Sequence, residues 1–536
     1  MSKKKIIKDD SFDKKKKKKI DNDISLDDKK KMRRKFCIGF LIFIFIFGTS
    51  LVRKTFQNDT FYTIKIGELI FNNGIDMMDH FSFHTDLAYT YPHWLYDCFI
   101  YIMYLIGGYV GIHISTIVLF LILIGIVFKT NIRICNNYSV AAFATFICTL
   151  AISGFATARA QLVSFILFAL EICFIEMFLK TKKKKYALGL LLVSLILCNV
   201  HVAVWPFYFI LYLPYLAEYV ISWICPKIKL KKENKFVKFL GNKFILDKNN
   251  HIKYLFIVMI LSLGTGLITP IGDTPYTYLI KTMLGNSQDY INEHQMITWM
   301  NSPFTIIIAF ETLFLTIISK TKLRDLFMVC GLVLMSIVSI RHLSLLALVG
   351  TICFSRLFTM FIEMFGFDVD TKIMKFFFKK SVAITAYVIV IVGSAFMMRY
   401  QLRGEYIDTK LYPVEAVDFI KENIDVKKMR IFNEYNFGSY LLLNDIPVFI
   451  DSRADLYTKR FSGFEYDIFD DFYMMPNIYQ KKFEFYDITH VLIYKKDNRF
   501  YDMLKYDHMY KNIYEDEYFI LLEKIGEHNT VVTYGS

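Results

Sequence analysis

The chain has 536 residues, of which 54% are hydrophobic, and its mean hydropathy of +0.36 excludes an ordinary water-soluble enzyme. Its formal net charge of +14 does not indicate nucleic-acid binding, because the basic residues lie in an N-terminal tail and in short loops between apolar runs. That distribution follows the positive-inside rule and predicts an α-helical multi-pass membrane protein.

The first 35 residues alternate lysine runs with acids, as in KKKKKKIDNDISLDD, and are too polar to build a core. We predict a disordered cytosolic tail, 1–35, that contacts anionic lipid. The apolar run that follows has no small-residue cleavage site, so we expect a retained anchor at 37–52 rather than a signal peptide.

The membrane domain is predicted over 36–400. Segment 53–108 is expected to be a long first outer loop that ends in an interfacial helix, 94–108, which is short for a span. The other predicted spans are 109–129, 138–154, 160–179, 186–199, 203–224, 254–269, 304–319, 326–340, 343–365 and 382–397. With about eleven spans, every lysine-rich loop lies on the cytosolic side of the plasma membrane.

This topology places many ionisable residues at the outer ends of the helices. Charged groups near membrane depth are costly and usually mark a functional site. The outer candidates are Asp59, Asp79, His84, His93, Arg159, His201, Glu293, Arg341 and His342. Glu171 and Glu176 instead lie within a predicted span, which indicates either pairing with neighbouring helices or a misplaced boundary.

Residues 401–536 predict an extracytoplasmic α/β domain. A helix is expected at YPVEAVDFIKENI, and strands are expected at 429–435, 446–452, 489–496 and 517–525. Asp451 and Arg453 follow a predicted strand, where they either bind a ligand or form an internal ion pair that fixes the loop. No nucleotide-binding motif is present.

The first outer loop contains two short motifs, DTFYTIKIG at 59–67 and GIDMMDHFS at 74–82, followed by Trp94 and Leu95. These motifs resemble the first outer loop of the GT-C superfamily of membrane glycosyltransferases. The segment FNEYNFGSYLLLNDIPVFIDSRADLY resembles the exported domain of some bacterial members, with matches at Gly438, Asp451 and Arg453. The resemblance implies transfer of a hexosyl or pentosyl group from a polyprenyl-phosphate sugar to a glycan, glycolipid or protein acceptor outside the membrane.

Two departures from the GT-C pattern concern acidic residues. Many relatives have a paired Asp-Glu in this loop, whereas Asp59 stands between Asn58 and Thr60. No outer DxD motif appears, because the DVD sequence at 368–370 falls on the cytosolic side. The spacing of Asp79, His84 and His93 is loose for metal ligands. No cofactor is therefore assigned, and a divalent metal stays an alternative.

We assign Asp59 as the catalytic base of an inverting transfer, by its position and by the resemblance. A cap of the following helix is the structural alternative. Arg159 and Arg341 are expected to hold the donor phosphate, helped by His201 and His342; snorkelling arginines and structural histidines are the alternatives. Asp79, His84, His93, Glu293, Asp451 and Arg453 are the candidate substrate-binding residues.

Three other functions remain open at this stage. A transporter or flippase of lipid-linked glycans is disfavoured because no inverted repeat is visible and the polar residues gather at one face. A ligase of lipid-linked glycans would share the substrate but not the Asp59 motif. An inactive protein that keeps only the GT-C fold is the third alternative, given the missing paired acid.

Overall fold

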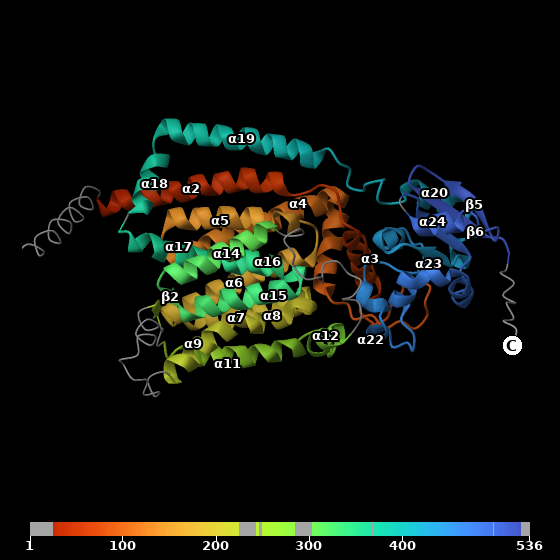
Figure 1. The fold of residues 1–536 in the computed structure, drawn as a ribbon, viewed down its shortest axis with the longest axis horizontal. Coiled ribbons are helices and arrows are strands. Elements are labelled where there is room, and N and C mark those ends of the chain that lie inside the picture. The colour runs from red at the N-terminus through yellow and green to blue at the C-terminus, as the bar shows by residue number, and fades with distance from the viewer. Residues whose placement is uncertain are drawn as a thin grey trace, which may run out of the picture.

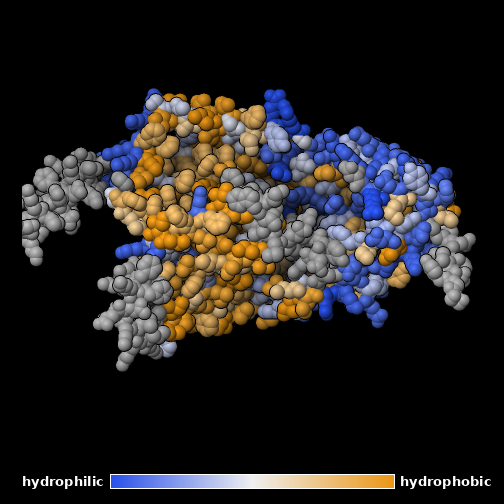
Figure 2. Space-filling view, viewed as in Figure 1, coloured by the Kyte–Doolittle hydropathy of each residue, from blue (hydrophilic) through white to orange (hydrophobic). Residues whose placement is uncertain are grey.

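The computed structural model describes residues 25–224, 243–245, 249–284, 303–366, 368–496 and 498–526. Figure 1 shows a bundle of long, roughly parallel helices, with a smaller α/β domain against one end. We call this end the site end and the other, where α2 begins, the opposite end. On the face seen in Figure 2, most residues of the bundle are hydrophobic and most residues of the α/β domain are hydrophilic. This division is expected if the bundle lies in lipid and the domain in water.

Each predicted span coincides with helical residues. The bundle helices are α2 (Leu26–Leu51), α4 (Trp94–Cys135), α5 (Tyr138–Ile152), α6 (Ala160–Thr181), α7 (Lys184–Val200), α8 (Trp205–Ile210), α9 (Leu213–Ile224), α11 (Ile252–Leu263), α12 (Thr274–Met283), α14 (Pro303–Ile318), α15 (Leu323–Val338), α16 (Leu343–Leu345), α17 (Thr351–Met364), α18 (Val369–Phe377) and α19 (Lys380–Leu402). Within the described residues, seven helices are long and apolar enough to cross a membrane, and two shorter ones are also apolar. The multi-pass helical fold is therefore confirmed.

Helix α4 joins the predicted interfacial helix to the next span. The helix is interrupted at Gly107 and Gly108, and Gly108 has a φ of +56°, which a residue with a side chain rarely adopts. The interruption falls at the predicted boundary, 108/109. Residues on its N-terminal side thus form a separate segment at the site end, where the first turn of α4 carries Asp97.

A network of buried charges explains Glu176, whereas the carboxyl oxygens of Glu171 in the same helix are buried with no hydrogen-bond partner among the described residues. Glu176 of α6 lies 2.7 Å from Arg356 of α17 and 3.3 Å from Arg324 of α15. Asp325 and Glu218 complete the network, at 2.8 Å from Arg356 and 3.4 Å from Arg324. Charges are tolerated inside such a bundle when they are paired, so Glu176 marks helix packing rather than a misplaced boundary.

Helix α3 (Asn58–Asn73) lies in the first part of the first outer loop and packs against α4. The close approach depends on Gly67, because a Cβ at this position would lie 2.3 Å from the carbonyl oxygen of Asp97. On its other side α3 contacts α21 (Gly438–Leu443) of the C-terminal domain. Lys65 of α3 also pairs with Asp445 at 2.7 Å. Helix α3 therefore connects the bundle to the domain.

The C-terminal domain contains a four-stranded sheet in the order β3-β4-β6-β5. Its strands are β3 (Ile431–Asn433), β4 (His490–Tyr494), β5 (Tyr510–Glu515) and β6 (Phe519–Lys524). Strands β3 and β4 are parallel, and the other pairs are antiparallel. The helices include α20 (Val414–Asn423), α22 (Lys459–Ser462), α23 (Ile468–Phe485) and α24 (Arg499–Leu504). A separate two-stranded sheet, β1 (Phe244–Ile245) with β2 (Thr321–Lys322), lies in the membrane part.

The predicted strand at 446–452 is wrong, and β5 was not predicted. Val448 instead forms an isolated bridge with Ser82 of the first outer loop. The backbone bonds are 3.1 Å from Val448 N to Phe81 O and 3.2 Å from Phe83 N to Val448 O. The apolar run IPVFI is thus buried by a loop more than 350 residues away in sequence, and the loop and the domain share one hydrophobic core.

Gly438 is expected to be indispensable for the packing of α21. A Cβ there would lie 2.0 Å from the carbonyl oxygen of Ile450 and 2.8 Å from the Cα of Asp451. Both are backbone atoms that cannot move aside. We expect Gly438→Ala to lower the stability of the domain by about 3 kcal/mol, the upper range for overpacking, as measured by thermal unfolding. Gly125→Ala, inside helix α4 with nothing within 4 Å of the added Cβ, should not lower the stability of the protein; equal destabilisation by the two variants would refute the packing argument.

Candidate functional site

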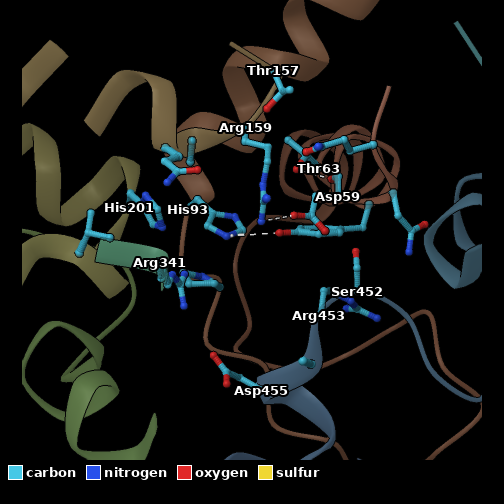
Figure 3. Close-up of a pocket in the computed structure, with 18 of the residues that line it drawn as sticks. Asp59, Thr63, His93, Thr157, Arg159, His201, Arg341, Ser452, Arg453 and Asp455 are labelled. Atoms are coloured by element: carbon cyan, nitrogen blue, oxygen red, sulfur yellow. Dashed lines mark hydrogen bonds and ion pairs between the residues drawn. The ribbon is translucent and has the colours of Figure 1, made fainter. Parts of the chain in front are cut away.

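A polar cavity of about 720 Å³ lies between the site end of the bundle and the C-terminal domain. Its walls come from the start of α3, the residue before α4, the turns before α6 and after α7, the segment Ile340–His342, and the C-terminal domain (Figure 3). Four arginines and two aspartates line it: Arg53, Arg159, Arg341, Arg453, Asp59 and Asp455. The excess of guanidinium groups favours an anionic ligand.

Asp59 lies in the first turn of α3 and points toward Arg159, as Figure 3 shows. The Oδ2 atom of Asp59 is 2.5 Å from an Nη atom of Arg159, and both side chains are partly exposed to the cavity, by 20% and 30%. The predicted base and one predicted phosphate ligand are thus in direct contact. The side chain of Asp59 does not cap α3, because the cap residue is Gln57, and it makes no side-chain cap bond.

Arg341 projects into the cavity from the turn Ile340–His342. Within the part of the chain that the structure describes, no carboxylate lies within ion-pair distance of its guanidinium. An uncompensated guanidinium in a partly enclosed polar cavity is a ready site for a phosphate. His342 also lines the cavity and makes an edge contact with Phe207, with the ring centroids 5.0 Å apart.

His201 follows α7 and is buried beside the arginines. Burial lowers its pKa well below the usual range, and His93, Arg341 and Arg159 lower the pKa further. The imidazole is therefore neutral at pH 7. Its Nδ1 lies 2.9 Å from the hydroxyl of Ser164, a contact in which the donor depends on the tautomer. His201 therefore adds a neutral polar group, not a further positive charge, to the wall of the cavity.

His93 lies at the centre of a chain of polar contacts. Its Nε2 is 3.3 Å from the hydroxyl of Tyr62, and its Nδ1 is 3.3 Å from Oδ1 of Asp97. Asp97 is completely buried, whereas Tyr62 and His93 line the cavity. A carboxylate on one ring nitrogen fixes the orientation of the imidazole. His93 is thus held with its other nitrogen toward the cavity.

Asp79, Asp451 and Arg453 form a buried cluster that holds the first outer loop on the C-terminal domain. The guanidinium of Arg453 is 2.6 Å from Asp79 and 2.7 Å from Asp451, and these side chains are at most 3% exposed. Tyr457 donates a hydrogen bond of 2.5 Å to Asp451. Of the three, only Arg453 also lines the cavity. These contacts favour a role for Asp451 and Asp79 in fixing the loop through ion pairs rather than in binding a ligand.

His84 does not line the cavity. The ring of His84 contacts the carbonyl oxygen of Phe449 at 2.8 Å, and burial lowers its pKa to about 4. His84 therefore packs as a neutral residue between the loop and the domain. Glu293 lies outside the described residues. Among the residues that are described, no group of three or more His, Cys, Asp or Glu is arranged to hold a metal ion.

Several lining residues were not predicted. Asp455 accepts a hydrogen bond from Tyr278 of α12, and it faces the cavity from the C-terminal domain with Ser452 (Figure 3). Tyr435 also lines the cavity, and its carbonyl oxygen accepts a hydrogen bond of 2.9 Å from Asn58. Asp455 lies in the sequence FIDSRADLY, two residues after Arg453. This spacing was the only feature of the sequence that could have indicated that Asp455 belongs to the site.

No protein-family model matches the sequence, and no curated protein matches it. Among solved structures, 21 chains match. One is the archaeal oligosaccharyltransferase AglB from Archaeoglobus fulgidus, in complex with an inhibitory peptide and a dolichol-phosphate. It superposes with a TM-score of 0.54 at 9% identity, over 85% of this chain and 69% of AglB.

The chain therefore shares the fold of this oligosaccharyltransferase, which agrees with the resemblance of its first outer loop to the GT-C superfamily. A second match is ArnT from Cupriavidus metallidurans bound to undecaprenyl phosphate, with a TM-score of 0.49 at 7% identity, over 92% of this chain and 97% of ArnT. At such low identity it is the fold that is shared, and the role of each residue in this chain must be argued from its own contacts.

Proposed function

We propose that this protein is an inverting glycosyltransferase that moves a sugar from a polyprenyl-phosphate donor to an acceptor outside the membrane. The observation that carries the proposal is the cavity at the end of a GT-C bundle, where Arg341 has no acidic partner among the described residues and Asp59 faces Arg159. The relative AglB was solved with a dolichol-phosphate, which is a polyprenyl phosphate. A lipid-linked anion fits a cationic cavity at the edge of an apolar bundle.

The donor phosphate is proposed to bind between Arg159 and Arg341, which enter the cavity from two different helical turns. Arginine's planar fork matches phosphate oxygens, and two forks stabilise the charge that develops as the phosphate leaves. The neutral imidazole of His201 lies beside both arginines and supplies a further hydrogen-bonding group. Phosphate binding would also draw Arg159 from Asp59 and so free the carboxylate.

Asp59 is proposed to act as the base. It accepts the proton of the acceptor hydroxyl as the hydroxyl oxygen forms a bond to the anomeric carbon of the sugar. The bond from that carbon to the phosphate oxygen breaks on the opposite face, and the polyprenyl phosphate leaves with the electron pair. Configuration is inverted because one displacement occurs. In the absence of substrate, the ion pair with Arg159 holds the side chain of Asp59 in place.

The acceptor is proposed to enter between the first outer loop and the C-terminal domain. Asp455 and Ser452 reach the cavity from the domain, and Tyr62 and His93 reach it from the loop. Carboxylate, hydroxyl and imidazole groups suit the hydroxyls of a sugar or a polar polymer. In this orientation, the N-terminus is cytosolic and the domain is extracytoplasmic, as the lysine-rich loops predict.

The function is tested with the purified full chain, reconstituted in vesicles with radiolabelled polyprenyl-phosphate sugars and a membrane extract as the acceptor source. We expect label to appear on an acceptor with inverted anomeric configuration. Movement of intact lipid-linked glycan across the vesicle, without release of the sugar, would instead establish the transporter. Binding of donor with no transfer from any sugar tested would identify an inactive GT-C protein and refute the proposal.

Arg341→Gln tests the phosphate site directly. Loss of a charged hydrogen-bond partner costs about 1.5–3 kcal/mol, so the affinity for polyprenyl phosphate should fall by roughly 10- to 150-fold, measured by tryptophan fluorescence or native mass spectrometry. The control is Arg399→Gln, an exposed arginine in the last turn of α19 that does not line the cavity. Equal affinities in the two variants would remove Arg341 from the donor site.

A further inference from the structure

A second large cavity lies at the opposite end of the bundle, far along the helices from the polar site. It has a volume of about 860 Å³ and is formed by α2, α5, α17, α18 and α19. Apolar side chains dominate its walls, among them Phe36, Phe43, Phe143, Phe358 and Tyr387. An apolar cavity of this size suits a hydrocarbon chain rather than a polar substrate.

The cavity exists because α19 stands apart from most of the bundle. Helix α19 packs on α2 and, at its start, contacts α18, and Ser394 is its only buried residue. Figure 1 shows α19 as the outermost helix beside α2, with α18 linking it to the rest. We expect the space between α19 and the helices α5 and α17 to be occupied, because side chains that line an empty cavity lose van der Waals contacts.

Two lysines mark one end of this cavity. Lys35 and Lys380 both line it, and the ammonium of Lys35 lies 5.6 Å from the ring centre of Phe378, two residues before Lys380. Among the described residues neither lysine has a carboxylate within ion-pair distance. The nearby acid Asp370 is already bound by the backbone N–H groups of Tyr138 and Ser139, each at 3.0 Å, and by Arg33 at 3.7 Å.

We infer that this cavity binds an anionic glycerophospholipid, with the phosphate between Lys35 and Lys380 and an acyl chain along the phenylalanines of α2, α5 and α17. The charge of the two lysines selects an anionic headgroup over a zwitterionic one. The apolar walls take the chain, and the lipid supports α19 against the bundle. In the DVD sequence at 368–370, Asp368 caps the start of α18 and Asp370 accepts a hydrogen bond from the start of α5, so both acids position helix ends beside the lipid site. The DVD sequence lies far from the sugar-transfer cavity.

The inference is tested by native mass spectrometry of the full chain with phosphatidylglycerol and phosphatidylcholine of identical acyl chains. Phosphatidylglycerol should bind more tightly. Because each lysine near an anionic lipid contributes roughly fivefold, Lys35→Ala with Lys380→Ala should weaken that binding about 25-fold and leave phosphatidylcholine unchanged. The control pair is Lys183→Ala with Lys184→Ala, exposed lysines at the same end that do not line the cavity.

A separate variant tests the apolar part of the site. Ala386→Trp places a large ring in the cavity and should lower the retention of both lipids, although the lysines are intact. Equal binding of the two lipids by the wild type, or unchanged binding by the double lysine variant, would overturn the inference. A polyprenyl phosphate retained by the Arg341→Gln variant and displaced by Ala386→Trp would show that the occupant is the donor lipid instead.

Discussion

Asp59→Asn is expected to lower sugar transfer by about 10²- to 10⁴-fold, the usual contribution of a general base. Asparagine keeps the shape of the side chain but cannot accept the proton of the acceptor hydroxyl. The contact with Arg159 would weaken because the charge is lost, yet Asp59 is partly exposed, so folding should not depend on it. The measurement is the transfer rate under saturating donor, together with the affinity for polyprenyl phosphate.

The matched control is Asp86→Asn. Asp86 lies in the same outer loop, is exposed, and has a φ of +64°, a conformation that asparagine also adopts readily. Transfer by this variant should equal that of the wild type. If Asp59→Asn transfers normally while Arg341→Gln loses donor binding, the transferase stands but the base is another group, and His93 with Asp97 is then the next to test.

Arg453→Met is expected to destabilise the C-terminal domain by about 3–5 kcal/mol. Methionine keeps the apolar stem, but Asp79 and Asp451 would be left as buried carboxylates without their cation. The loss of stability is measured by thermal unfolding, followed by fluorescence, and by the rate of proteolysis of the loop 74–93. Arg460→Met, at an exposed arginine of the same domain, should be nearly neutral. Adding Asp79→Asn to Arg453→Met should recover part of the stability, because one unpaired charge is removed.

The same cluster predicts a dependence on pH. Burial alone would raise the pKa of Asp79, but the charge of Arg453 and the hydrogen bonds from Ser82 lower it below its usual value. A carboxyl group whose pKa is lower in the folded state stabilises the fold above its unfolded pKa of about 3.9, and that contribution disappears as the pH falls through the folded value. The stability difference between the wild type and Arg453→Met should therefore shrink at acidic pH. A difference that is constant down to pH 2 would show that Asp79 is not coupled to Arg453.

The sequence by itself determined the membrane part. Long apolar runs separated by lysine-rich loops give the helices, because backbone groups in lipid must be bonded within the helix and lysine avoids the apolar layer. The boundary at 108/109 was also predicted, because segment 94–108 is too short to span the membrane, and the helix interruption lies there. The glycine and aspartate motifs of the first outer loop indicated the GT-C fold.

Only the tertiary structure decided which polar residues meet. Asp59 and Arg159 are 100 residues apart in sequence, and Asp79 and Arg453 are 374 apart, so no local pattern joins them. Nothing in the sequence distinguishes these two Arg–Asp pairs, but their surroundings differ. The pair Asp59–Arg159 lies in an open cavity, whereas the pair Asp79–Arg453 is buried between a loop and a domain. Burial and the partners that chain folding brings together decide whether a charge binds a ligand or fixes the fold, and both are properties of the packed molecule.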